Sequence, residues 1–71
     1  MERFGEKLRT LRKQHGMTMR ELATTLELAS HGSISDLESG RQTPSTRLTM
    51  KIARLFNVST DQLLFDDLEL D

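Results

Sequence analysis

The sequence predicts an all-α fold, a single domain of five short helices, from three observations. Apolar residues recur every three or four positions, as on one face of a helix, and no segment alternates apolar and polar residues as a half-buried strand does. Two pairs of a hydroxyl residue and a glutamate or glutamine three positions later signal helix starts. The 71 residues include no cysteine, so packed helices, without disulfides or a thiolate-bound metal, must stabilise the small core.

The first helix is expected from about Glu2 to His15. Phe4, Leu8 and Leu11 stand at positions i, i+4 and i+7 and form its apolar face. Gly16 follows, and glycine is the usual residue in the left-handed conformation that ends a helix. The helix is therefore expected to bury one side and to stop at this glycine.

The second helix is expected from about Met19 to Glu27. Thr18 and Glu21 form a capping box at its start, in which the hydroxyl and the carboxylate each accept a hydrogen bond from a backbone N–H. The side of this helix that faces the core would carry Leu22, Ala23 and Leu26.

The third helix is expected from about His31 to Ser39. Ser30 is a favourable N-cap residue, and Gly40 fits the left-handed position after the last turn. The side of this helix that faces the core would carry Ile34 and Leu37.

Two more helices are expected after the polar loop that contains Pro44. Ser45 can cap the fourth helix, and Asn57 can adopt the left-handed conformation that ends it. Ser59 and Gln62 form a second capping box, which opens a short fifth helix. The apolar positions are Leu48, Ile52, Leu55 and Phe56 in the fourth helix, and either Leu63 or Leu64 in the fifth.

The charges are distributed unevenly along the chain. Ten basic and eleven acidic residues give a net charge of −1, which by itself argues against a nucleic acid as the partner. However, residues 1–56 hold all ten basic residues and six acidic ones, whereas the last fifteen residues hold five acids and no base. We expect a basic domain, residues 1–65, and an acidic tail, residues 66–71, held away from the nucleic-acid face. A solubilising segment, or the start of a linker to another domain, would explain the tail equally well.

Several functional classes are disfavoured. No apolar segment is long enough to cross a membrane or to act as a secretory leader, so we expect a cytoplasmic protein that has no membrane partner. The two histidines, His15 and His31, have no cysteine or acidic cluster at metal-ligand spacing, and no glycine-rich phosphate loop follows a strand. An enzyme is therefore not expected, nor is a metal or another cofactor.

The second and third predicted helices have the spacing of a helix-turn-helix unit. Three or four residues separate them, and in such a unit the second helix lies in the major groove of DNA while the first crosses the backbone. Any small helical bundle also contains adjacent short helices, so the spacing alone fits a non-binding bundle as well.

Four short runs resemble the Cro and phage-repressor (Xre-type) helix-turn-helix family. They are Thr18–Ala23, Ser33–Arg41, Pro44–Ser45 and Leu55–Ser59, and they occur in the family's order and close to its spacing. The resemblance covers residues 4 to about 64. It implies a five-helix, lambda-repressor-like domain that binds operator DNA, usually as a dimer on a palindrome.

The resemblance implies that the third helix reads base edges. The positions concerned are Ser30, His31, Gly32, Ser33 and Asp36. Serine hydroxyls can donate or accept, His31 can donate to guanine, and Asp36 can accept only from the amino group of cytosine. The set contains no arginine, asparagine or glutamine for a bidentate contact, and each of these residues could equally be solvated on a short helix. Gly32 could instead let the backbone approach DNA closely.

Other residues are implied to touch phosphates. They are Thr18, Met19, Arg20, Arg41 and Thr43, with Arg41 the principal contact, from the loop after the third helix. Met19 stands where the family commonly has glutamine, which leaves the backbone N–H groups of the helix start to face a phosphate. The turn after Leu26 is one residue longer than the family pattern, so the second helix is expected to continue through Glu27.

Two further roles complete the expectations. The resemblance places Arg12 of the first helix against Glu38 of the third, as a partly buried structural pair. A homodimer interface is expected after the fourth helix, at Val58, Leu64 and Phe65, because this region has more apolar side chains than so small a core needs. The other possibility is that the residues around Leu64 fold back to close the core.

The sequence therefore predicts a regulator of transcription that binds double-stranded DNA. We expect a homodimeric repressor that reads a palindromic operator through the third helix, about residues 31–39. The alternative is a protein-interaction module on the same fold, such as an antitoxin or a partner-binding regulator with weak or no DNA binding.

Overall fold

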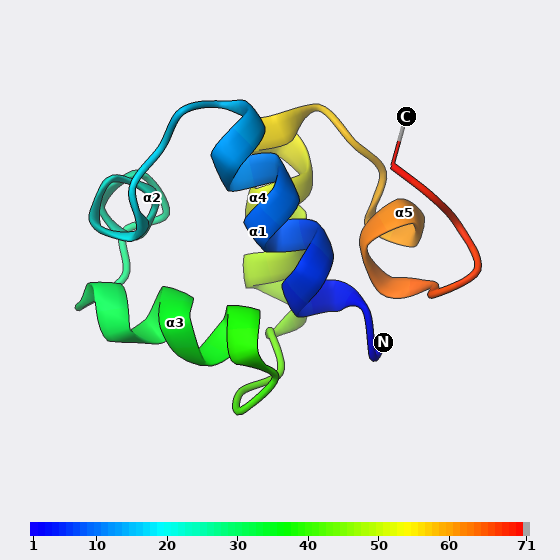
Figure 1. Ribbon diagram of the computed structural model, residues 1–71, viewed down its shortest axis with the longest axis horizontal. Helices are drawn as coiled ribbons and strands as arrows, with labels where there is room; N and C mark the ends of the chain where they lie inside the picture. The colour runs from blue at the N-terminus through cyan, green and yellow to red at the C-terminus, as the bar shows by residue number, and fades with distance from the viewer. Residues whose placement is uncertain (71) are drawn as a thin grey trace.

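The computed structural model describes residues 1–70, which form five α-helices and, within that range, no strand (Figure 1). The all-α prediction is confirmed. Asp71, the last residue of the predicted tail, lies outside the described residues. The helices are α1 (Phe4–Gln14), α2 (Met19–Thr25), α3 (His31–Ser39), α4 (Thr46–Phe56) and α5 (Thr60–Leu64).

Local side-chain chemistry starts three of the helices as predicted. The hydroxyl of Thr18 accepts from the backbone N–H of Glu21 at 3.0 Å, and the Glu21 carboxylate accepts from the backbone N–H of Thr18 at 2.9 Å. Ser59 and Gln62 form the same reciprocal pair at the start of α5, with both distances 2.9 Å. Ser45 caps α4 with a 3.1 Å bond from the backbone N–H three residues later. These caps satisfy amides that have no partner inside the helix.

The helix ends follow the prediction at three positions and depart from it at one. Gly16, Gly40 and Asn57 adopt the left-handed conformation, with φ of 64°, 84° and 55°. The expectation that the second helix continues through Glu27 is wrong, because α2 ends at Thr25 and Glu27 itself has a φ of 61°.

A paired hydrogen-bond pattern explains the early end of α2. The N–H of Glu27 donates to the carbonyl of Thr24 at 3.1 Å, and that of Leu28 donates to the carbonyl of Ala23 at 2.8 Å. This is the Schellman arrangement, which requires a left-handed residue at the place that Glu27 occupies. The glutamate therefore performs the role that glycine usually has.

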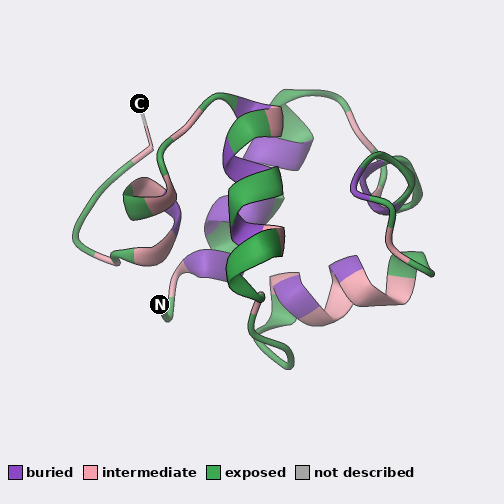
Figure 2. Ribbon diagram, turned by 180° about the vertical axis from the view of Figure 1, so that it is seen from behind, coloured by how far each residue is buried: buried purple, intermediate pink, exposed green. Residues whose placement is uncertain are grey.

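The core lies where α1, α3, α4 and α5 meet, with α2 packed against α3. In Figure 2 the outer side of α4 is exposed, and the buried parts of the helices face the interior. Leu63, not Leu64, is the buried leucine of α5. The apolar side chains with at most 1% exposure are Leu8, Leu22, Ile34, Leu37, Ile52 and Leu63.

Gly5 allows α1 and α3 to approach each other closely. A Cβ atom at Gly5 would lie 2.7 Å from the carbonyl oxygen of Leu37 and closer still to that of Glu38. Both are backbone atoms at the end of α3, so any larger residue would push the helices apart. The contact fixes the distance between α3 and the rest of the domain.

The buried Lys7 joins α1 to the end of the chain. Its Nζ donates to the backbone carbonyls of Gln62 at 2.6 Å, of Phe65 at 2.8 Å and of Leu68. Carbonyls at and beyond the end of a helix have no partner inside it and attract a cation. Lys7 thus holds the turn after α5 against the domain, although it is 2% exposed and, within residues 1–70, forms no ion pair with a carboxylate.

Residues 66–69, part of the predicted tail, lie against the start of α1. The carboxylate of Asp66 accepts from the backbone N–H groups of Glu2 and Arg3, each at 2.9 Å. Arg3 makes two hydrogen bonds to the Glu69 carboxylate, at 2.7 and 2.9 Å. These bonds lower the pKa of Asp66, chiefly through the backbone N–H of Arg3, and that of Glu69, chiefly through the guanidinium of Arg3.

Candidate nucleic-acid interface

The second and third helices form a helix-turn-helix at one end of the molecule. Figure 1 shows α2 along its axis and α3 from its side, at the end opposite α5 and the C-terminal segment. The turn between them consists of residues 26–30. Such a unit presents the outer side of its second helix to the major groove.

Two contacts with the core determine which side of α3 faces outward. Ile34 and Leu37 are buried, and Leu37 lies under the close approach at Gly5. His31 is exposed, whereas Gly32 and Ser33 are half-buried. His31 is therefore the most exposed position in the first turn of α3.

The start of α3 departs from the expected cap. Ser30 has the extended backbone of an N-cap residue, but among the described residues its hydroxyl accepts no cap hydrogen bond. The first turn is closed instead by the backbone N–H of Ser33, which donates to the carbonyl of Ser30 at 3.2 Å. The predicted side-chain cap is therefore wrong, and the hydroxyl remains on the exposed surface.

Asp36 and Arg41, predicted for different DNA contacts, lie beside each other. Nη1 of Arg41 is 3.7 Å from Oδ1 of Asp36. The backbone N–H of Gln42 donates to the carbonyl of Asp36 at 3.2 Å, which holds the loop against the last turn of α3. The Arg41 side chain is 76% exposed and extends into solvent.

A buried ion pair connects α1 to the end of α3. Nε and Nη2 of Arg12 donate to the two carboxylate oxygens of Glu38, at 2.7 and 3.2 Å. Nη1 of Arg12 donates to the carbonyl of Met17 at 3.0 Å. The hydrogen bonds to Glu38 raise the pKa of Arg12, and both side chains are at most 10% exposed. With every donor group directed at the protein, this pair positions α3 and leaves nothing for DNA.

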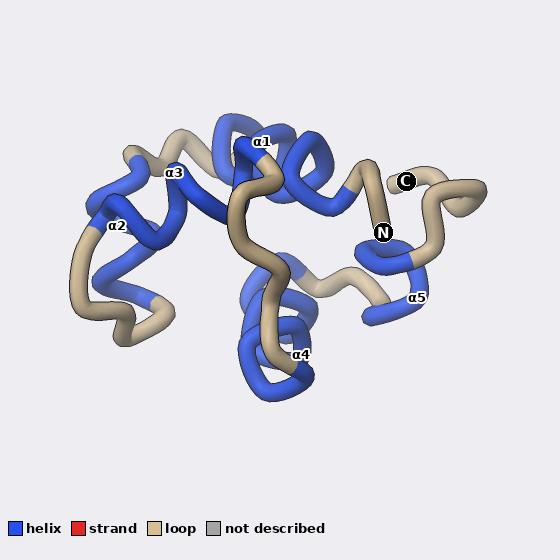
Figure 3. The backbone as a smooth tube through the Cα atoms, turned by 90° about the horizontal axis from the view of Figure 1, so that it is seen from below, coloured by secondary structure: helices blue, strands red, loops and turns tan. Residues whose placement is uncertain are grey.

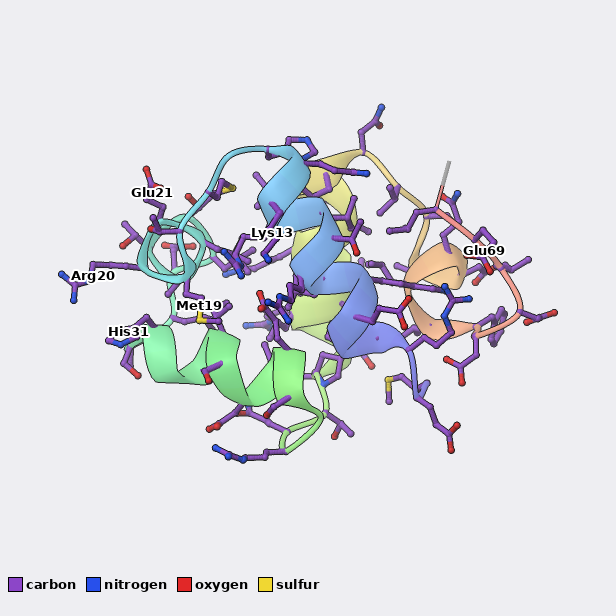
Figure 4. All side chains as sticks on the ribbon, in the orientation of Figure 1. Lys13, Met19, Arg20, Glu21, His31 and Glu69 are labelled. Atoms are coloured by element: carbon purple, nitrogen blue, oxygen red, sulfur yellow. The ribbon has the colours of Figure 1, made fainter. Side chains whose placement is uncertain are left out.

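The structure separates the candidate phosphate contacts into two groups. Arg20 extends away from the domain on the same side as His31 (Figure 4), and Thr43 is exposed in the loop before α4. Met19 instead packs against the core, so its side chain does not reach outward. The hydroxyl of Thr18 accepts a hydrogen bond in the capping box.

A groove beside the loop before α4 contains two cations that the sequence analysis did not single out. It lies between the turn after α2 and the loop from α3 to α4, has a volume of about 480 Å³ and is lined in part by Arg47 and Lys51. Figure 3 shows these two connections from below. Nζ of Lys51 is 3.3 Å from Oε1 of Glu27, and both side chains are exposed. Arg47 and Lys51 stand four residues apart on α4, a spacing that fits an ordinary solvated helix face equally well.

The apolar surface near α5 is smaller than predicted and extends onto α4. Phe65 is 54% exposed, but Val58 and Leu64 are half-buried and pack against the core. Met50 of α4 is 47% exposed. It lines a hollow of about 500 Å³ together with Leu64. The spacing of the apolar residues in α4 could have identified Met50, because it stands off the buried side.

Two further observations concern cofactors and membranes. Nowhere in residues 1–70 do three or more histidine, cysteine or acidic side chains gather in a way that could hold a metal ion. Over the same residues, each helix is too short or too polar to cross a membrane.

Comparison with known proteins shows the family to which this chain belongs. Residues 8–63 match the helix-turn-helix family. The matched segment contains the whole of α2, α3 and α4. The chain is 43% identical over 65 residues to an HTH-type transcriptional regulator of Archaeoglobus fulgidus, covering 90% of this chain and 91% of that protein. A second regulator of this type from the same organism is 35% identical over 65 residues and 90% of each chain.

A bacterial relative is similar over a part of its length. The HTH-type transcriptional regulator ImmR of Bacillus subtilis is 35% identical over 64 residues, which are 90% of this chain and 50% of that protein. The chain therefore spans about half of ImmR.

Proposed function

We propose that this chain, which belongs to the helix-turn-helix family of DNA-binding transcriptional regulators, is a cytoplasmic repressor whose α3 reads a palindromic operator. One observation carries this proposal. The reading helix is held against the domain at Gly5 and through the Arg12–Glu38 pair. In its first turn His31 is exposed, and within residues 1–70 a Cβ atom at Gly32 would meet no other helix or loop beyond the hydroxyl of Ser30. A rigidly held helix with a bare outer side is what insertion into a major groove requires.

The exposed cations support binding to the DNA backbone. Three of the ten basic residues, Arg3, Lys7 and Arg12, are buried or half-buried with partners within the chain. The other seven are exposed: Arg9, Lys13, Arg20, Arg41, Arg47, Lys51 and Arg54. Phosphate contacts of this kind position a protein on DNA without reading sequence. In this proposal Arg41, Arg20 and Thr43, with the N–H groups at the start of α2, bind phosphates.

Two copies are proposed to bind together. A single α3 offers His31, Asp36 and two serines to the bases, and each good contact discriminates by only about 1–3 kcal/mol, so a pair of helices is needed to find a site. Phe65 and the hollow beside Met50 provide an apolar surface for the second copy. A symmetric pair requires half-sites about 10–10.5 base pairs apart.

Selection of bound duplexes from a random-sequence library tests the proposal. The expected result is enrichment of an inverted repeat with that spacing, and sedimentation of the complex should give two chains per duplex. Phe65→Ala should weaken binding to the repeat while leaving binding to an isolated half-site unchanged. Recovery of a non-repeated site bound by one chain would contradict the dimer, and failure to enrich any sequence would contradict operator recognition.

Two observations favour a second candidate, a protein-interaction module on the same fold. The reading side carries an acidic residue, Asp36, and the side chain of Met19 turns inward at the phosphate position. An interaction module would show no salt-dependent affinity for DNA, whereas affinity for any duplex falls steeply with salt when phosphates are bound.

A further inference from the structure

Asp36 occupies an unusual position for an acidic residue. It stands on α3 one turn after Gly32, on the helix that the proposed function places in the major groove. A carboxylate among phosphates is repelled unless a cation lies close to it. Here a cation does lie close, since Nη1 of Arg41 is 3.7 Å from Oδ1 of Asp36.

The backbone holds Arg41 near this carboxylate. Gly40 ends α3 in the left-handed conformation, with a φ of 84°, and turns the chain back. The N–H of Gln42 then donates to the carbonyl of Asp36 at 3.2 Å, and the hydroxyl of Ser39 donates to the same oxygen at 3.2 Å. Arg41 lies between these anchored residues, so its closeness to Asp36 follows from the turn that ends the helix.

Gly32 leaves space on the approach to Asp36. Apart from the backbone of α3 itself, a Cβ atom at Gly32 would have one described atom within 4 Å, the hydroxyl of Ser30 at 3.4 Å, so no other described element fills this position. Residues four apart on a helix lie about one turn apart, or about 5.4 Å along the axis. A base edge can therefore approach α3 at Gly32 and meet the carboxylate of Asp36 next to it.

We propose that Asp36 and Arg41 act as one recognition unit that selects cytosine in the operator. Arg41 supplies the positive charge that lets Asp36 stand against DNA, and Asp36 accepts a hydrogen bond from the cytosine amino group. The guanidinium has five N–H donors, enough to face Asp36 and a phosphate together. The inference rests on the proposed function, because it requires α3 to lie in the major groove.

The chemistry of the base edges favours cytosine over the other bases. Guanine and thymine present acceptors in the major groove, which repel a carboxylate. Adenine presents an amino group beside the N7 acceptor, so a carboxylate meets one favourable and one repulsive group. The cytosine amino group has an acceptor on one side only, O6 of the paired guanine, whereas the adenine amino group lies between two, its own N7 and O4 of the paired thymine.

The test measures the affinity of the full chain for the duplex selected from a random library, and for duplexes with each base exchanged in turn. Wild type should show one position per half-site at which cytosine is favoured by about tenfold. Asp36→Asn should reduce that preference to about twofold and leave the preferences at other positions intact. Arg41→Ala should weaken binding to every duplex and also reduce the preference for cytosine.

Matched variants separate this inference from simpler effects of charge. Asp67→Asn removes the same charge from the C-terminal segment, and Arg54→Ala removes a cation from α4; both should leave the cytosine preference unchanged. If Asp36→Asn strengthens binding to all duplexes equally, or if Arg41→Ala keeps the cytosine preference, the recognition unit is contradicted while operator binding stands. If wild type binds no duplex, the proposed function fails first and the inference falls with it.

Discussion

At the α5 end of the molecule, Arg3 and Lys7 are bound by groups of the chain itself. At the α2–α3 end, Arg20 (Figure 4) and the exposed Arg41 extend into solvent. Arg3 and Lys7 donate to two carboxylates and to four backbone carbonyls, and they hold the C-terminal segment in place. The cations at the α2–α3 end, Arg20 and Arg41, contribute little to holding the fold together. Arg41 has only a loose contact with Asp36.

This difference explains why the net charge is a poor guide to the partner of this protein. The ion pairs within the fold occupy acidic residues as well as basic ones, because Glu38 and Glu69 are bound to arginines. The charges in these pairs are therefore not available to a partner. A cation whose donors are all satisfied within the fold contributes to stability and offers nothing to a ligand. Substitutions at the α5 end should therefore change stability, and substitutions at the α2–α3 end should change binding to DNA.

The largest expected effect on stability is at Lys7. Lys7→Met keeps the apolar stem and removes the ammonium. Among the described residues, this leaves the carbonyls of Gln62 and Leu68 without a donor and takes one of two donors from the carbonyl of Phe65. An unpaired buried group costs about 1–3 kcal/mol, so we expect a loss of about 3 kcal/mol or more. Urea unfolding measures it. Lys13→Met on the exposed side of the same helix is the control and should change stability by less than about 0.5 kcal/mol. Equal effects of the two substitutions would refute the structural role of Lys7.

The next largest effect is expected at the pair that positions α3. Glu38→Ala leaves the buried guanidinium of Arg12 without its bidentate partner, which should lower the free energy of unfolding by about 2–3 kcal/mol. Thermal unfolding followed by circular dichroism provides the measurement. Glu6→Ala, on the exposed side of α1, serves as the control. A melting temperature unchanged in Glu38→Ala would show that the pair does not position α3.

Acid should weaken the α5 end selectively. The folded pKa values of Asp66 and Glu69 lie below their unfolded values, so their contribution to stability is fully present above the ordinary carboxyl range, about pH 4, and is lost as pH falls through the lowered values. Asp66→Asn should accordingly be less stable than wild type at pH 7, and the gap should close as pH falls below about 4. A gap that stayed constant with pH would show that the Asp66 charge contributes nothing.

The smallest expected effect concerns the turn that leads into α3. Glu27 holds a left-handed conformation that costs a residue with a side chain about 1 kcal/mol, so Glu27→Gly should raise stability by about that amount. Glu27→Ala also removes the contact with Lys51 but keeps the strain, and should be close to neutral. Both are measured by urea unfolding. A destabilised Glu27→Gly protein would mean that the side chain supports the turn.

Features that depend on neighbouring residues could be predicted from the sequence. The capping boxes at Thr18 and Ser59 and the glycine at position 40 act within four residues, so their chemistry is visible in a short window. The end of α2 was missed because glutamate gives no signal for the left-handed conformation. The five helices and the family resemblance therefore followed from local patterns.

Features that depend on distant contacts could not be predicted. Gly5 meets α3 more than thirty residues away, and Lys7 meets carbonyls 55 to 61 residues away. Nothing near a lysine in an amphipathic helix distinguishes a buried position from a solvated one. The candidate DNA contacts remain predictions, because a binding surface is defined by a partner as much as by the chain.

The most direct test of the account compares one cation from each end. The affinity of the full chain for its selected duplex is measured against salt concentration for wild type, Arg41→Ala and Arg3→Ala, after circular dichroism confirms folding. The slope of log affinity against log salt should be steep for wild type, smaller in magnitude by about 1 for Arg41→Ala, and unchanged for Arg3→Ala. Equal slopes for wild type and Arg41→Ala, or a reduced slope for Arg3→Ala, would contradict the division of charge between the two ends.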